Sequence, residues 1–249
     1  MPGDHTPTYD EWLVMVFDHP ELPNGWYEDD DEYAKAWDAE SDPVAAVTYQ
    51  TRLFEEPELV MRRYTPQQIG FGLNFLIHAT LSFHVRAFVD PQVPLGFRVR
   101  GVRAIGNLYE TLFATLIDPA CSRVGVTVDS SGRRADSLGF VCFMWWDVWS
   151  NLPFFLEKQK EAERDTRPDD SVGFTSHPEL VDAGWAAMKQ ALATKHYLCM
   201  EGALHGLGHW QFAEPETVSV IVDAFLASRP ELPSDLREYA LQAREGDVQ

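Results

Sequence analysis

Residues 195–210, KHYLCMEGALHGLGHW, bring together side chains that can do chemistry. Glu201, His205 and His209 follow one another at four-residue intervals, so in a helix each lies about 40° around the axis from the last. Neighbouring members of this row can share a divalent metal ion, as the two histidines of a zincin helix do. Glu201 and His209, however, are roughly 12 Å apart along the axis. All three therefore cannot bind one ion, and another helix must donate a ligand.

A metal-dependent hydrolase or a metal-binding protein that uses these three residues is one functional hypothesis. Asp147 or His78 could be the donated ligand, and Glu201 could act as a general base. The sequence contains no HExxH motif, nucleophile elbow or glycine-rich cofactor loop. We therefore favour packing or capping as the role of His205 and His209 and expect no resident cofactor, with a divalent metal as the alternative.

The glycines of the same stretch need an explanation of their own. Gly202, Gly206 and Gly208 each cost about 1 kcal/mol relative to alanine inside a helix. Gly202 and Gly206, four residues apart, predict a flat strip that a neighbouring helix approaches closely. Gly208 is predicted to end the helix in a left-handed conformation, which would place His209 beyond the helical row.

The run GALHGLGHW followed by PETVSVIVDAFLAS resembles one unit of a HEAT-like helical repeat. The resemblance covers roughly the last quarter of the chain and implies solenoid-like packing of helices, a family trait usually used for protein binding. The stretches HPELPNGWY, FMWWDVW and EGALHGLGHW together also resemble a bacterial protein family to which we attach no activity.

Helix-start signals recur along the chain and predict an all-α fold. Asp42-Pro43, Thr65-Pro66 and His177-Pro178 each place a proline at the first helical position. One long helix is expected from residue 96 to about 117. The predicted architecture is stacked helical hairpins, whether HEAT-like, solenoid or an irregular bundle, with a small loop or hairpin excursion near 119–137.

The segment FMWWDVW is predicted to lie in the core. Cys142, Trp145, Trp146 and Trp149 are spaced for one helical face. Asp147 within this run needs a partner, because a buried carboxylate is costly alone, and His205, His209 or an arginine could supply it. Arginines 98, 100 and 103 are expected to pair with acidic residues of the same chain.

The 249 residues are 45% hydrophobic, which suits one domain spanning residues 1–249. A division into parts 1–157 and 177–249, joined by an exposed segment 158–176, is the alternative. The sequence has no run of eighteen apolar residues, and its first residues are neither basic nor hydrophobic. We therefore predict no membrane span and no secretory signal. Three cysteines without a CxxC pair fit a reducing compartment, so a cytoplasmic location is expected. Oligomeric state is left open.

The net charge of −19 suggests the kind of partner. Residues 1–60 hold 16 acidic and 2 basic side chains, residues 61–160 hold 7 and 11, and residues 161–249 hold 16 and 7. Acidic ends argue against nucleic-acid binding. We predict a non-enzymatic acidic binding protein, for example of an immunity or inhibitor type, that captures a basic protein partner. Its expected contact residues are Trp26, Tyr27, Glu28, Asp29, Asp30, Asp31 and Glu32.

Overall fold

The computed structural model describes residues 6–36, 42–78, 82, 84–119, 137–149, 152–153 and 176–248. All the regular secondary structure in these ranges is helical, which confirms the predicted all-α class. The larger elements are α1 (Tyr9–Phe17), α2 (Asp30–Ala36), α3 (Pro43–Glu55), α4 (Glu58–Arg63), α5 (Pro66–Ile77), α6 (Leu95–Asn107), α8 (Ser137–Trp149), α10 (Pro178–Ala193), α11 (Tyr197–Trp210), α12 (Pro215–Ser228) and α13 (Ser234–Glu245).

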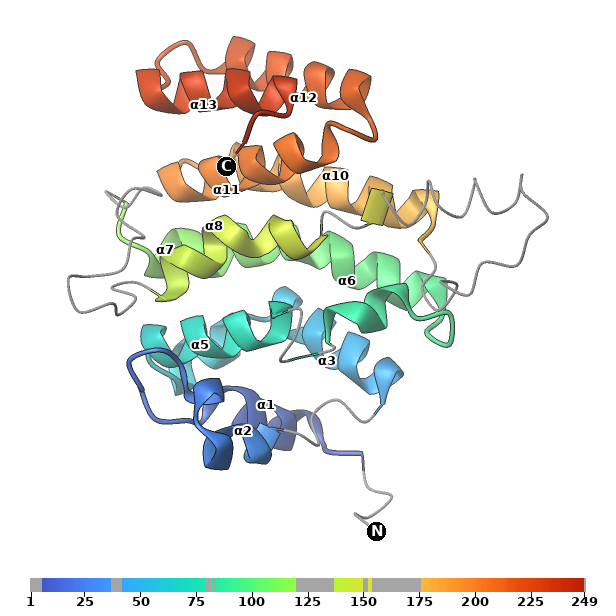
Figure 1. Cartoon of the computed structure of the whole chain (residues 1–249), viewed down its shortest axis with the longest axis vertical. Coiled ribbons are helices and arrows are strands. Elements are labelled where there is room, and N and C mark those ends of the chain that lie inside the picture. The colour runs from blue at the N-terminus through green and yellow to red at the C-terminus, as the bar shows by residue number, and fades with distance from the viewer. Residues whose placement is uncertain are drawn as a thin grey trace.

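The helices stack in pairs from the N-terminal to the C-terminal end of the molecule (Figure 1). At successive levels of this view lie α1 and α2, then α3 and α5, then α6 and α8, then α10 and α11, and finally α12 and α13. Between layers, α6 packs against both α3 and α10, and α8 packs against both α5 and α11. The arrangement is solenoid-like. α6 contacts α10, α8 contacts α11, and residues 108–113 also contact α10, so the parts 1–157 and 177–249 pack against each other.

The helix starts follow the predicted signals. Thr65 caps α5 with a reciprocal capping box, and Thr8 does the same for α1. The Asp42 side chain accepts from the backbone N–H of Val44 at the start of α3. His177 caps α10 through its side chain, ahead of the proline that opens that helix. Each cap satisfies an N–H group that the first helical turn leaves without a partner.

The long helix predicted to end near residue 117 is interrupted by a π-helical turn. α6 ends at Asn107, the π-helix η4 covers Leu108–Phe113, and the short α7 covers Ala114–Leu116. The buried Tyr109 in this turn donates its hydroxyl proton to the Cys142 carbonyl at 2.7 Å. Its own carbonyl accepts from the Cys199 thiol at 3.8 Å. The π-turn thus contacts both α8 and α11.

The core prediction for the tryptophan-rich helix is confirmed. Trp145, Trp146 and Trp149 are at most 1% exposed, and the buried apolar residues form one cluster that extends from α1 to α13. Of the three arginines predicted to pair with acidic residues, Arg100 is shown to do so: it makes a forked contact with Glu55 at 2.7 and 2.6 Å.

Two sequence predictions concern segments that fall largely outside the described residues. Residues 120–136 of the excursion expected near 119–137 lie outside the described residues. So do residues 158–175 of the exposed connection expected at 158–176. Within the described ranges, no helix combines the length and the apolar character that crossing a bilayer requires.

Candidate metal-binding site

Two glycines allow α11 to lie directly against α8. A Cβ atom on Gly202 would stand 2.6 Å from the Cys142 carbonyl oxygen, and one on Gly206 would stand 2.5 Å from the Trp146 Cβ. Real Cβ atoms do not approach other atoms this closely, so only glycine permits the observed helix spacing. The predicted glycine strip is therefore confirmed, and it brings the histidines of α11 close to Asp147 of α8.

The prediction that Gly208 ends the helix is wrong. α11 continues to Trp210, and the glycines with positive φ in the described chain are Gly25 and Gly246. A Cβ on Gly208 would stand 2.4 Å from the side chain of Val248, so this glycine makes room for the C-terminal segment. As a result His209 stays on the helix, one turn after His205.

Asp147, His205 and His209 converge on one point. The Asp147 Oδ1 atom lies 2.7 Å from His205 Nε2 and 2.7 Å from His209 Nε2. The two Nε2 atoms are 3.1 Å apart. The sequence-based expectation that Asp147 finds its partner in these histidines is confirmed, and the carboxylate comes from α8 while both imidazoles come from α11.

The surroundings hold His205 more firmly than His209. His205 is 3% exposed, its Nδ1 atom is 2.7 Å from the Tyr239 hydroxyl of α13, and the Phe143 ring lies 4.4 Å from its ring centroid. The side chains of His209 and Asp147 are 34% and 27% exposed. His205 therefore forms the buried side of the cluster, and His209 and Asp147 form the side that solvent reaches.

Electrostatics keep Asp147 ionised. Burial raises the pKa of its carboxyl, but the hydrogen bonds from His205 and then His209 lower it by more, so the pKa lies well below its ordinary value. An ionised carboxylate beside two imidazole nitrogens is a donor set that binds divalent metals.

The geometry of the three atoms suits one ion. The atoms form a triangle with sides of 2.7, 2.7 and 3.1 Å. An ion at the usual distance of about 2.1 Å from each would sit about 1.3 Å above the plane of the triangle. Three ligands on one side leave further coordination positions for water or an exogenous ligand.

Glu201, the third member of the row predicted from the sequence, is not part of this cluster. It is 2% exposed, whereas the group of ligand atoms that lie within 4.8 Å of one another consists of Asp147, His205 and His209. His78, the other donor that the sequence suggested, does not belong to that group. The metal hypothesis therefore keeps its two histidines and Asp147 as the donated ligand, and it loses Glu201.

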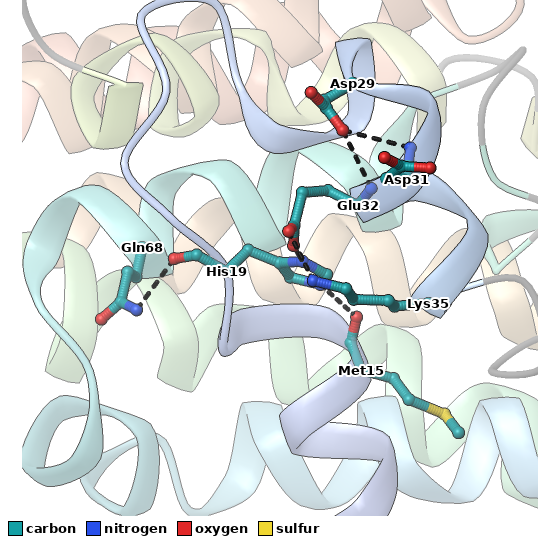
Figure 2. A network of polar contacts seen from close by, with 7 residues as sticks. All are labelled: Met15, His19, Asp29, Asp31, Glu32, Lys35 and Gln68. Carbon is teal, nitrogen blue, oxygen red and sulfur yellow. Dashed lines mark hydrogen bonds and ion pairs between the residues drawn. The ribbon is translucent and has the colours of Figure 1, made fainter.

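The predicted partner-binding segment has a different structure from the one expected. Trp26 is 1% and Tyr27 is 6% exposed, so this aromatic pair belongs to the core and is not available as a contact surface. The carboxylate of Asp29 accepts from the backbone N–H groups of Asp31 and Glu32 (Figure 2). Residues 28–31 are exposed, and their contact with a partner stays a prediction.

A scan against protein-family models gives no match for this chain, and neither curated proteins nor solved structures give one. The HEAT-like and bacterial-family resemblances therefore remain predictions.

Proposed function

We propose that this protein binds a divalent transition-metal ion through Asp147, His205 and His209. The observation that carries the proposal is the convergence of three ligand atoms from two helices within 3.1 Å of one another. Packing alone does not require two imidazole nitrogens to meet at one carboxylate oxygen.

The donor types indicate which ions fit. Two imidazoles and one carboxylate suit Zn²⁺ or Fe²⁺ better than the hard ions Mg²⁺ and Ca²⁺, which prefer oxygen ligands. When bound, such an ion would act as a Lewis acid and carry water at its open positions. Tyr239 would accept the Nδ1 proton of His205 and so hold the Nε2 lone pair toward the ion.

A zinc titration in competition with a chromophoric chelator tests the proposal. We expect one ion per chain for protein purified without an affinity tag, and an affinity lowered at least about 100-fold in His209→Asn, since a direct ligand is lost. His209 is partly exposed, so this variant should fold.

His177→Ser is the matched control. It removes an exposed histidine and keeps a side chain that can cap α10, so its zinc affinity should equal that of the wild type. Absence of stoichiometric binding by the wild type, or equal affinities for His209→Asn and His177→Ser, would contradict the proposal.

Capture of a basic protein is a second candidate function. It is supported by the net charge of −19 and by the exposed acidic residues 28–31, while the burial of Trp26 and Tyr27 limits the contact to charge. Such a contact speeds association at low salt.

With a co-purified partner in hand, Glu28→Lys combined with Asp30→Lys should slow association without changing the thermal unfolding midpoint. An unchanged association rate would exclude this surface.

A further inference from the structure

His19 is buried between two hydrogen-bond acceptors (Figure 2). Its Nδ1 atom lies 2.8 Å from Glu32 Oε2, and its Nε2 atom lies 2.7 Å from the backbone carbonyl oxygen of Met15. The residue is 4% exposed, so water cannot easily replace either partner. It lies just after α1 and contacts Trp26 and Glu32 of residues 26–36, the acidic segment.

The chemistry of these two partners fixes the protonation state that fits best. A carbonyl oxygen accepts only, and so does an ionised carboxylate. A neutral imidazole has one N–H group and would leave its other nitrogen lone pair facing an oxygen lone pair. An imidazolium has an N–H group on each nitrogen and satisfies both acceptors. The Trp26 ring stacks on it at 3.7 Å and 10°, a contact that favours a cation.

We propose that His19 is doubly protonated in this structure and acts as a pH-dependent latch. It joins Glu32 of α2 to the Met15 carbonyl of α1, and it covers Trp26 of η1 (Trp26–Glu28). The latch therefore holds the acidic segment 26–36 onto the body of the molecule while both nitrogens carry protons.

The charged and polar groups around the latch come from α2, from the residues just before it and from α5. Glu32 also pairs with Lys35, and the hydrogen bonds from Lys35 and then His19 lower the pKa of Glu32. Asp29 faces the backbone N–H groups that open α2, and Gln68 of α5 donates to the His19 carbonyl. A carboxylate with a lowered pKa stays ionised throughout the range in which imidazoles titrate.

The direction of the pH effect follows from this arrangement. The latch is complete at mildly acidic pH, where His19 has both protons. When His19 loses one proton as pH rises, one of the two contacts is lost. Segment 26–36 should then open more often, exposing Trp26 and freeing the carboxylates of α2. This inference does not depend on metal binding.

Nitrogen-15 NMR of the His19 side chain, together with amide hydrogen exchange, tests the latch from pH 5.5 to 8.5. We expect both ring nitrogens to be protonated at pH 5.5 and to lose one proton as pH rises. Over the same range the protection factors of residues 26–36, corrected for intrinsic exchange, should fall about tenfold, because a charged hydrogen bond is lost. Protection in α12 should not change.

Two variants complete the experiment. In His19→Gln the protection of residues 26–36 should be low and independent of pH, whereas His177→Ser should behave as the wild type. In Glu32→Gln the imidazolium loses its anionic partner, so the NMR midpoint should move to lower pH. A neutral His19 at pH 5.5, a segment protection that does not respond to pH, or an unchanged pH response in His19→Gln would each overturn the proposal.

Discussion

Two histidine–carboxylate clusters in the described part of the chain use the same residue types in opposite ways. At the N-terminal end, His19 has an internal acceptor on each nitrogen, a carboxylate at 2.8 Å and a carbonyl at 2.7 Å. At the C-terminal end, His205 and His209 share one Asp147 oxygen, and their Nε2 atoms lie 3.1 Å apart. The first arrangement favours a proton on every nitrogen, whereas the second brings two Nε2 atoms and a carboxylate oxygen to one point that solvent reaches, where a metal ion could replace the protons of their hydrogen bonds. The partner of the imidazole nitrogen that does not face the carboxylate differs between the clusters: it is the Met15 carbonyl for His19 and the Tyr239 hydroxyl for His205. The carbonyl requires a protonated nitrogen and so favours an imidazolium, whereas the hydroxyl is compatible with a neutral imidazole that can bind an ion.

Gly202→Ala should change stability and zinc affinity more than any other substitution that tests this comparison. The added methyl group would meet the Cys142 carbonyl at 2.6 Å and force α11 away from α8. We expect a loss of about 3 kcal/mol of unfolding free energy, the upper range for overpacking, and weaker zinc binding because Asp147 and the histidines lie on the two separated helices. Urea unfolding and the chelator competition measure the two effects.

Gly96→Ala is the matched control for that substitution. Gly96 lies in the first turn of α6, where an added Cβ would meet no atom within 4 Å. This variant should be as stable as the wild type or up to about 1 kcal/mol more stable. If Gly202→Ala were equally neutral, the close helix contact would not be what positions the metal ligands.

Asp147→Asn should have an intermediate effect that depends on pH. The folded-state pKa of Asp147 is lowered, so its ionised contacts stabilise the protein above the pKa of the unfolded carboxyl, about 4. We expect the substitution to cost about 2 kcal/mol at pH 7 without metal, and less as pH falls below about 4. Urea unfolding at pH 7, 4 and 2.5 measures this. A penalty that grows on acidification would show that the carboxylate is not the stabilising form.

The smallest effect should come from Tyr239→Phe. The variant keeps the ring that stacks near His205 and removes the hydroxyl that contacts Nδ1. We expect zinc affinity to fall about tenfold, as for other groups that orient a metal-bound histidine. The NMR titration of His19 should be unaffected, because that residue lies at the other end of the stack. A simultaneous change in both clusters would mean that the substitution perturbs the whole fold.

Local chemistry made the helix starts and the glycine strip predictable from the sequence. An Asp-Pro or Thr-Pro pair carries its own cap, and two glycines four residues apart lie on one helical face in any context. The pairing of Asp147 with histidines also followed from the cost of burying a lone carboxylate.

Tertiary contacts decided what the sequence could not. Gly208 looks like a helix end, but the side chain of Val248 is what requires a glycine there. Glu201 has the right spacing from His205, yet periodicity within one helix does not show which neighbouring helix supplies a ligand. Trp26 and Tyr27 stand beside exposed acids in the sequence, although both are buried in the fold.

The last helical layer has a consequence for how this molecule responds to force. α13 packs on α11 and α12, and its Tyr239 reaches back to His205 in the layer before it. In a stack where each layer is stabilised mainly by its neighbours, fraying begins at the ends. A force applied to α13 would therefore perturb His205 early through Tyr239. An ion bound at Asp147, His205 and His209 would raise the force needed to unfold these helices.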